Sequence, residues 1–137
     1  MSLNWPIPSH NFAAEYQVSS WPFLTSSAAA EVDVTPIQVS FPFVTRWVQV
    51  FNTNGTAANT LRVGVTRNGV LGTAVTGANY ILLNGGQATE RLELKCNQLW
   101  FLRGAGTSVS FSVVAGLTNV STNFPAVTGS NGFAGVG

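Results

Sequence analysis

The feature that most constrains the fold of this chain is an alternation of apolar and polar side chains with a period of two. Residues 108–113 alternate strictly between serine and an apolar side chain, within a patterned range of 107–115. The ranges 60–67 and 90–96 show the same pattern, with leucine or valine at alternate positions. Successive side chains of a strand point to opposite faces, so each range predicts a strand with one buried face.

Two further strands are predicted over 36–41 and 44–52, on either side of Pro42. Proline has no N–H to donate to a sheet, so Pro42 predicts a bend or bulge between them. The second strand is apolar on both faces, which predicts a central place in a sandwich or a covering partner. Its apolar side chains are Val44, Val48 and Val50 on one face, and Trp47 and Phe51 on the other. The range 99–102, which includes Trp100, is also apolar on both faces.

Short sequences that contain glycine separate these strands. Asn54-Gly55 and Asn68-Gly69 predict tight hairpins, because both residue types tolerate a positive φ. Asn84-Gly85-Gly86 and Gly104-Ala105-Gly106 predict two further turns. Only 25–31, with its three alanines, suits a short helical turn, and a loop suits it equally. Short strands separated by turns predict an all-β fold, an antiparallel sandwich or barrel.

The two ends of the chain differ from its middle. Residues 1–14 and 118–137 are predicted to form extended N- and C-terminal arms around a β-sandwich domain over 15–117. The C-terminal range is rich in glycine and serine yet keeps spaced apolar side chains, which a pure linker does not need. Such an arm either docks into a neighbour or folds back on its own sandwich. The residues predicted to contact a partner are Trp5, Phe12, Trp21, Phe124, Val127, Phe133 and Val136.

Charge is scarce: Asp, Glu, Lys and Arg make up 8% of the chain, against about 25% in typical domains. A Ser–His–acid site needs a positioned base, and the only histidine, His10, sits in a proline-rich segment. The lone cysteine, Cys96, has no other base to activate it and is predicted to be a small buried hydrophobe. The chain is therefore predicted not to be an enzyme, with no catalytic residues and no cofactor.

Two pairs of carboxylates come closest to a functional pattern. Glu31 and Asp33 have strand spacing and would contribute to a calcium site only if loops converged on them. A solvated strand face is the simpler interpretation. Glu90 and Glu93 fall on opposite faces of one strand, which does not suit a glycosidase pair. No metal site is predicted.

The charge balance also bears on partners. A net charge of +1 and the lack of a basic stripe argue against nucleic acid. No apolar run approaches the roughly 18 residues of a membrane span, and the first residues lack signal-peptide features. No membrane contact is therefore predicted, and folding in a cytoplasm is expected. A monomer with so few charges is prone to associate, which predicts permanent contacts in a symmetric assembly.

The four tryptophans leave a second function open. Trp5 and Trp21 precede prolines in or beside loops, and Trp47 and Trp100 lie within predicted strands. Core packing or subunit contact is the simpler interpretation of the latter two. The alternative is a glycan-binding module, because aromatic rings stack on sugars. That function predicts exposed tryptophans that line one concave patch.

Four segments of the chain share a recognisable pattern. They are EYQVSSWPF (15–23), FPFVTRWVQV (41–50), ERLELKCNQLWFL (90–102) and VVAGLTNV (113–120). A Glu-Leu-Lys run leads into an aromatic strand, and an Ala-Gly-Leu-Thr exit follows the last strand. In these segments the chain resembles the small virion structural proteins of tailed bacteriophages. The resemblance extends over about residues 15–137. It implies a jelly-roll-like sandwich, often a homotrimer, that decorates the exterior of a capsid as a cement protein.

The function expected from this resemblance is a clamp on neighbouring major capsid subunits, made in the host cytoplasm and carried on the virion. A tail or neck component with the same sandwich is a further alternative. The arms would gain free energy by burying apolar side chains, and many copies on one shell would make modest contacts effective. Deletion of 118–137 is predicted to leave a folded sandwich that attaches more weakly to the shell.

Overall fold

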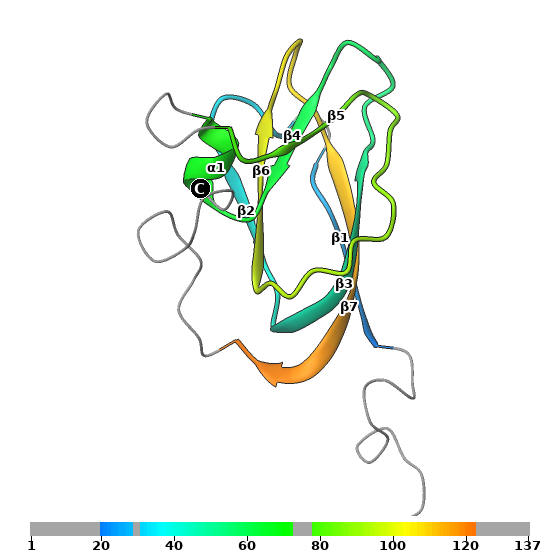
Figure 1. The fold of residues 1–137 in the computed structure, drawn as a ribbon. Coiled ribbons are helices and arrows are strands. Elements are labelled where there is room, and N and C mark those ends of the chain that lie inside the picture. Colours follow the sequence, from blue (N-terminus) through cyan, green and yellow to red (C-terminus); the bar gives the residue numbers. More distant parts are fainter. Residues whose placement is uncertain (1–19, 29–30, 73–77, 123–137) are drawn as a thin grey trace, which may run out of the picture.

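The computed structural model describes residues 20–28, 31–72 and 78–122. Two antiparallel sheets face each other as a β-sandwich (Figure 1), which confirms the predicted fold class. The predictions that fall on His10, Trp5, Phe12 and the apolar residues of 123–137 lie outside the described residues.

Seven described strands divide between the two sheets. The first sheet has the order β1-β7-β3 and consists of β1 (Trp21–Ser26), β7 (Phe111–Ser121) and β3 (Phe43–Asn52). The second has the order β2-β6-β4-β5 and consists of β2 (Ile37–Ser40), β6 (Gln98–Arg103), β4 (Leu61–Gly64) and β5 (Ile81–Leu83). A jelly roll has eight strands in two Greek keys, and the jelly-roll connectivity stays a prediction.

The core fills the space between the inner faces of these sheets. The rings of Phe101 (β6) and Phe111 (β7) stack across it, with 4.0 Å between their centroids. On β7 the inward residues Val113 and Ala115 are almost fully buried, as the period-two pattern predicts. The range 90–96 keeps its predicted alternation but does not form one of the named strands. It meets β3 at one bridge, between Leu92 and Val48, and through hydrogen bonds of Thr45 to the Leu94 and Cys96 carbonyls.

Pro42 separates two strands that belong to different sheets. β2 pairs with β6 and β3 pairs with β7, so the predicted bend is a crossing from one sheet to the other. The register of β3 shifts on both sides of Thr45, which is the signature of bulged pairing. This irregularity buries Val44 and Thr45 together, although they are neighbours in sequence.

Strand β1 lies over a range for which no strand was predicted. Pro22 interrupts the apolar pattern there, but β1 is at the edge of its sheet, where a missing N–H is tolerated. Thr25 and Ser26 therefore belong to a strand, and the helical turn suggested over 25–31 does not begin at Thr25.

The two predicted Asn-Gly hairpins are both wrong. Asn68-Gly69 lies inside the one-turn helix α1 (Arg67–Leu71). The Thr66 hydroxyl caps this helix by accepting from the Gly69 N–H at 2.9 Å, and the helix ends at Gly72 with φ 62°. Asn54-Gly55 does form a turn, but the turn joins β3 to β4 in the other sheet. The turns predicted at 84–86 and 104–106 are confirmed, with positive φ at Gly86 and Gly106.

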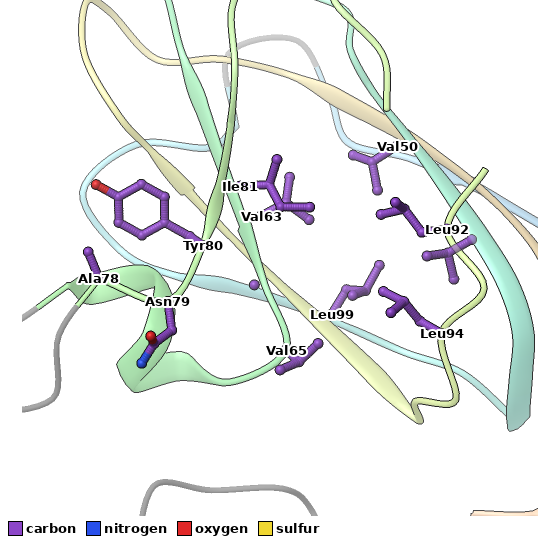
Figure 2. Close-up of a pocket in the computed structure, with 12 residues that line it drawn as sticks. Val50, Val63, Val65, Ala78, Asn79, Tyr80, Ile81, Leu92, Leu94 and Leu99 are labelled. Carbon is purple, nitrogen blue, oxygen red and sulfur yellow. The ribbon is translucent and has the colours of Figure 1, made fainter. Parts of the chain in front are cut away.

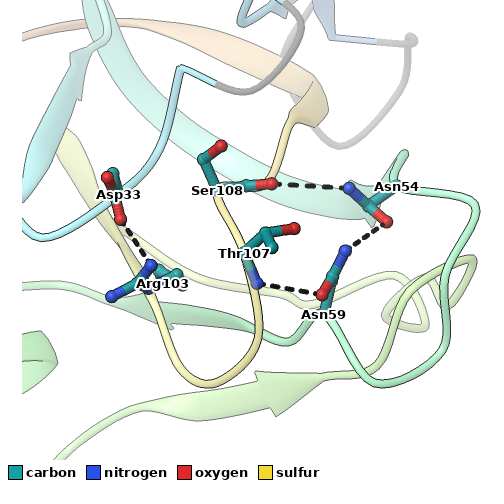
Figure 3. Close-up of polar contacts among 6 residues, drawn as sticks. All are labelled: Asp33, Asn54, Asn59, Arg103, Thr107 and Ser108. Atoms are coloured by element: carbon teal, nitrogen blue, oxygen red, sulfur yellow. Dashed lines mark hydrogen bonds and ion pairs between the residues drawn. The ribbon is translucent and has the colours of Figure 1, made fainter.

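Side-chain amides hold together the loops that cross between the sheets at one end of the sandwich (Figure 3). Asn59 donates to the Asn54 side chain at 3.0 Å and accepts from the backbone N–H of Thr107 at 3.0 Å. Nearby, the Arg103 guanidinium forms an ion pair with Asp33 at 2.7 Å. These contacts fix where β6 and the 53–60 loop leave their sheets. At the opposite end, β7 continues to Ser121, so residues 118–121 belong to the sandwich.

Candidate interaction surface

The three-stranded sheet turns one face to the core and the other outward. Pairing puts Pro22 and Trp47 beside Gly116, and Leu24 and Gln49 beside Val114. The third row is Ser26, Ser112 and Phe51. We call these nine residues the outer face: Pro22, Leu24, Ser26, Trp47, Gln49, Phe51, Ser112, Val114 and Gly116.

None of the nine residues of the outer face is charged, and its large side chains are apolar except for Gln49. Leu24 is 75% exposed, and a groove of about 410 Å³ runs over β7 between Leu24 and Phe51. The Ser26 and Ser112 hydroxyls bond to each other at 2.7 Å, so each already has a partner within the chain. Exposed Leu24 and half-buried Trp47, Phe51 and Val114 share this face, and apolar residues grouped in this way mark an interaction site more often than scattered ones do.

The other sheet differs because α1 packs on its outer side. Val70 of α1 is fully buried, and a Cβ built on Gly64 would lie 2.7 Å from its Cγ1. Arg62 of β4 donates to the carbonyl oxygens of Val70 and Leu71 at 3.0 and 3.2 Å. Within the described ranges, the helix therefore covers part of the four-stranded sheet and leaves the three-stranded sheet uncovered.

Trp47 is the largest side chain of the outer face, and its position depends on Gly116. A Cβ at residue 116 would lie 2.3 Å from the indole Nε1, so only glycine lets the ring lie flat over β7. The Arg91 guanidinium stands 5.3 Å from the Trp47 ring centroid at the rim of the face. The strand predicted to be apolar on both faces thus has one face in the core and one in this surface.

Trp21 is the one predicted partner-contact residue that the structure describes. It is 45% exposed at the start of β1, and its indole N–H donates to the Asn119 side chain at 3.0 Å. Its register partner is the core residue Leu117, so Trp21 has the inward parity and lies at the edge of the core. Trp100 lies on the four-stranded sheet, opposite Gln38. The three described tryptophans therefore do not share one patch.

The residues with reactive side chains are engaged in structural contacts. Cys96 is buried against the Thr45 hydroxyl at 3.3 Å, as predicted, and burial raises the pKa of its thiol despite hydrogen bonds that lower it. Glu31 accepts from the Ala28 N–H at 2.7 Å, and Glu93 pairs with Arg91. In the part of the chain that the structure describes, no three His, Cys, Asp or Glu side chains gather into a group for a metal ion.

Sequence reasoning identified only part of the outer face. The two apolar faces predicted for 44–52 pointed to Trp47 and Phe51. Leu24 was not identified because no strand was predicted over 21–26. Val114 was not singled out, although the alternation that turns Val113 and Ala115 inward also turns Val114 outward.

Comparisons with protein families, with curated proteins and with solved structures find no match to this chain. Among the described residues, no helix has the length and apolar character needed to cross a membrane.

Proposed function

We propose that this protein is a non-enzymatic structural protein of a tailed-phage virion, which decorates the capsid exterior and clamps neighbouring major capsid subunits. The observation that carries the proposal is the uncharged, uncovered outer face of the three-stranded sheet. The scarcity of charge and the resemblance of four segments to phage virion proteins also support it.

The outer face suits a second copy of this chain. The net charge of +1 leaves little repulsion between copies. Because the outer face carries no charge, it offers no electrostatic complementarity to a charged partner. With strand spacings of about 4.8 Å and a rise of about 3.4 Å per residue, the face covers roughly 300 Å². A standard interface buries about 800 Å² on each partner.

The difference in area gives the terminal segments a role. If the outer face supplies less than half of a standard interface, the remaining contact has to come from elsewhere in the chain. The ranges 1–14 and 123–137 are almost free of charge and rich in spaced aromatic and apolar residues. In this proposal the outer face supplies part of the contact between the copies of a trimer, and the terminal segments complete that contact and reach the shell.

The test uses phage particles assembled without this protein. Purified full-length protein is added, and the particles are imaged by electron cryomicroscopy and heated to measure release of their DNA. Protein at regular positions on the shell exterior, with release at a higher temperature, is expected. Protein confined to the tail or neck would overturn the capsid assignment, and no binding would overturn the proposal.

A shortened chain separates the roles of the sandwich and the arm. Because β7 ends at Ser121, the deletion should remove 123–137 and keep the whole strand. The truncated protein is expected to stay folded and to occupy fewer shell sites. Full occupancy by a folded truncated protein would exclude a role for this segment in attachment.

A further inference from the structure

A second apolar feature lies inside the sandwich, where the two sheets do not close. A cavity of about 350 Å³ opens between β5 and the 88–96 segment (Figure 2). Side chains from both sheets and from that segment line it, and none of its lining residues is charged. Its walls include Val50, Val63, Val65, Ile81, Leu92 and Leu94.

The cavity exists because the sheets are incomplete on this side. β5 has only three residues and is the edge of its sheet. Across from it, the 88–96 segment meets β3 through single bridges, such as the reciprocal 2.8 Å hydrogen bonds of Leu92 with Val48. Ile81 of β5 lines the cavity and is 44% exposed at the rim. The opening therefore has apolar walls and an apolar rim.

An apolar cavity of this size accepts an aromatic ring. A cavity of about 150 Å³ is enough to bind benzene, so the space here holds a phenyl ring and a smaller neighbour. The C-terminal segment 123–137 offers two such pairs, Phe124-Pro-Ala-Val127 and Phe133-Ala-Gly-Val136. Both have phenylalanine three residues before valine, and the segment carries no charged side chain.

The place where β7 ends puts this segment within reach. Ser121 pairs with Phe43, and two residues further along β3 the Thr45 hydroxyl donates to the Leu94 carbonyl at 2.6 Å. Leu94 lines the cavity, so its wall is two strand spacings from the end of β7, or about 10 Å. Fifteen extended residues span up to about 50 Å.

We propose that a phenylalanine of the segment 123–137 occupies this cavity in its own chain. Attachment to the same chain favours this occupant, because it gives the segment a high effective concentration at the cavity. The segment would have to leave the cavity before contacting a shell. The inference itself does not depend on the proposed virion function, because it concerns the isolated protein.

The test measures competition in the full-length protein. A fluorescein-labelled peptide of residues 123–137 is titrated with the wild-type chain and with a Phe124→Ala/Phe133→Ala variant, and binding is followed by fluorescence anisotropy. The variant is expected to bind the peptide at least tenfold more tightly, because its own segment no longer competes. Equal affinities for the two proteins would overturn the proposal.

Two further substitutions in that double variant locate the binding site. Val65→Phe fills the cavity and should abolish peptide binding. Ala78→Phe adds a ring at the exposed rim, so it should also abolish peptide binding, with little risk to folding. Val34→Phe adds an equal ring at a residue that is 70% exposed outside the cavity, and should change nothing. Binding that survives both cavity substitutions would place the peptide elsewhere. If wild-type protein excludes the peptide only at high protein concentration, the segment of one copy fills the cavity of another. That result would overturn occupancy within one chain.

Discussion

Replacement of Leu24 by serine tests whether the outer face holds copies of the chain together. Leu24 is 75% exposed in the isolated chain. Full burial of a leucine side chain gains about 1.5–3 kcal/mol, so covering the exposed three quarters is worth about 1–2 kcal/mol. At 1.4 kcal/mol for each factor of ten, Leu24→Ser should raise the dissociation constant of the oligomer by roughly 5- to 30-fold for each Leu24 side chain that the contact buries.

The assay is sedimentation equilibrium over a range of protein concentrations, together with urea unfolding of each variant. Val34→Ser is the matched control, because Val34 is similarly exposed but lies outside the outer face. Both substitutions should leave the unfolding free energy of the monomer within about 0.5 kcal/mol of wild type. If Leu24→Ser associates as tightly as Val34→Ser, the outer face is not the contact between copies.

Two other predictions concern the interior of the sandwich. Asn52 is buried, and its amide donates to the carbonyl oxygens of Asn59 and Leu83 at 3.0 and 3.1 Å. Asn52→Leu removes the amide from both carbonyls. The substitution should therefore lower the free energy of unfolding in urea by about 2–5 kcal/mol. A loss below 1 kcal/mol would show that water replaces the amide. Burial raises the pKa of the Cys96 thiol, so above about pH 8.5 the unfolded chain loses this proton before the folded chain does. The free energy of unfolding of wild type should therefore fall relative to that of Cys96→Ala as the pH rises from 8 to 11, by up to about 1.4 kcal/mol per pH unit. If the unfolding free energies of the two proteins change equally with pH, the prediction is wrong.

The period-two pattern predicted the faces of strands well but not their neighbours. Val113 and Ala115 lie in the core as expected, because burial of alternate residues depends only on the local pattern. The sheet to which a strand belongs depends on contacts between residues distant in sequence. The sequence around Pro42 is therefore compatible both with a bend within one sheet and with a crossing between two sheets. Asn54-Gly55 was misjudged for the same reason. A short loop that contains glycine serves a crossing between sheets as well as a hairpin, and the described glycines with a positive φ are Gly72, Gly86 and Gly106, not Gly55.

The candidate site was only partly predictable because exposure is a property of the assembled sheet. Trp47 and Phe51 could be identified from a strand with two apolar faces. Leu24 could not, since β1 itself was obscured by Pro22 and the strand forms only against β7. The cavity beside β5 was also beyond sequence reasoning, because it results from an incomplete pairing between segments far apart in the chain.

The pairing of β1 with β7 has a consequence for synthesis of the protein. Ser26 and Ser112, which bond to each other, are separated by 86 residues. At a translation rate of about 5–20 residues per second, β1 emerges from the ribosome roughly 4–17 seconds before its partner strand. During that interval the backbone of Trp21–Ser26 has no sheet to join, and Leu24 and Phe23 are open to other nascent chains. Slower translation should therefore lower the yield of folded protein, and a chaperone that shields this strand should restore it.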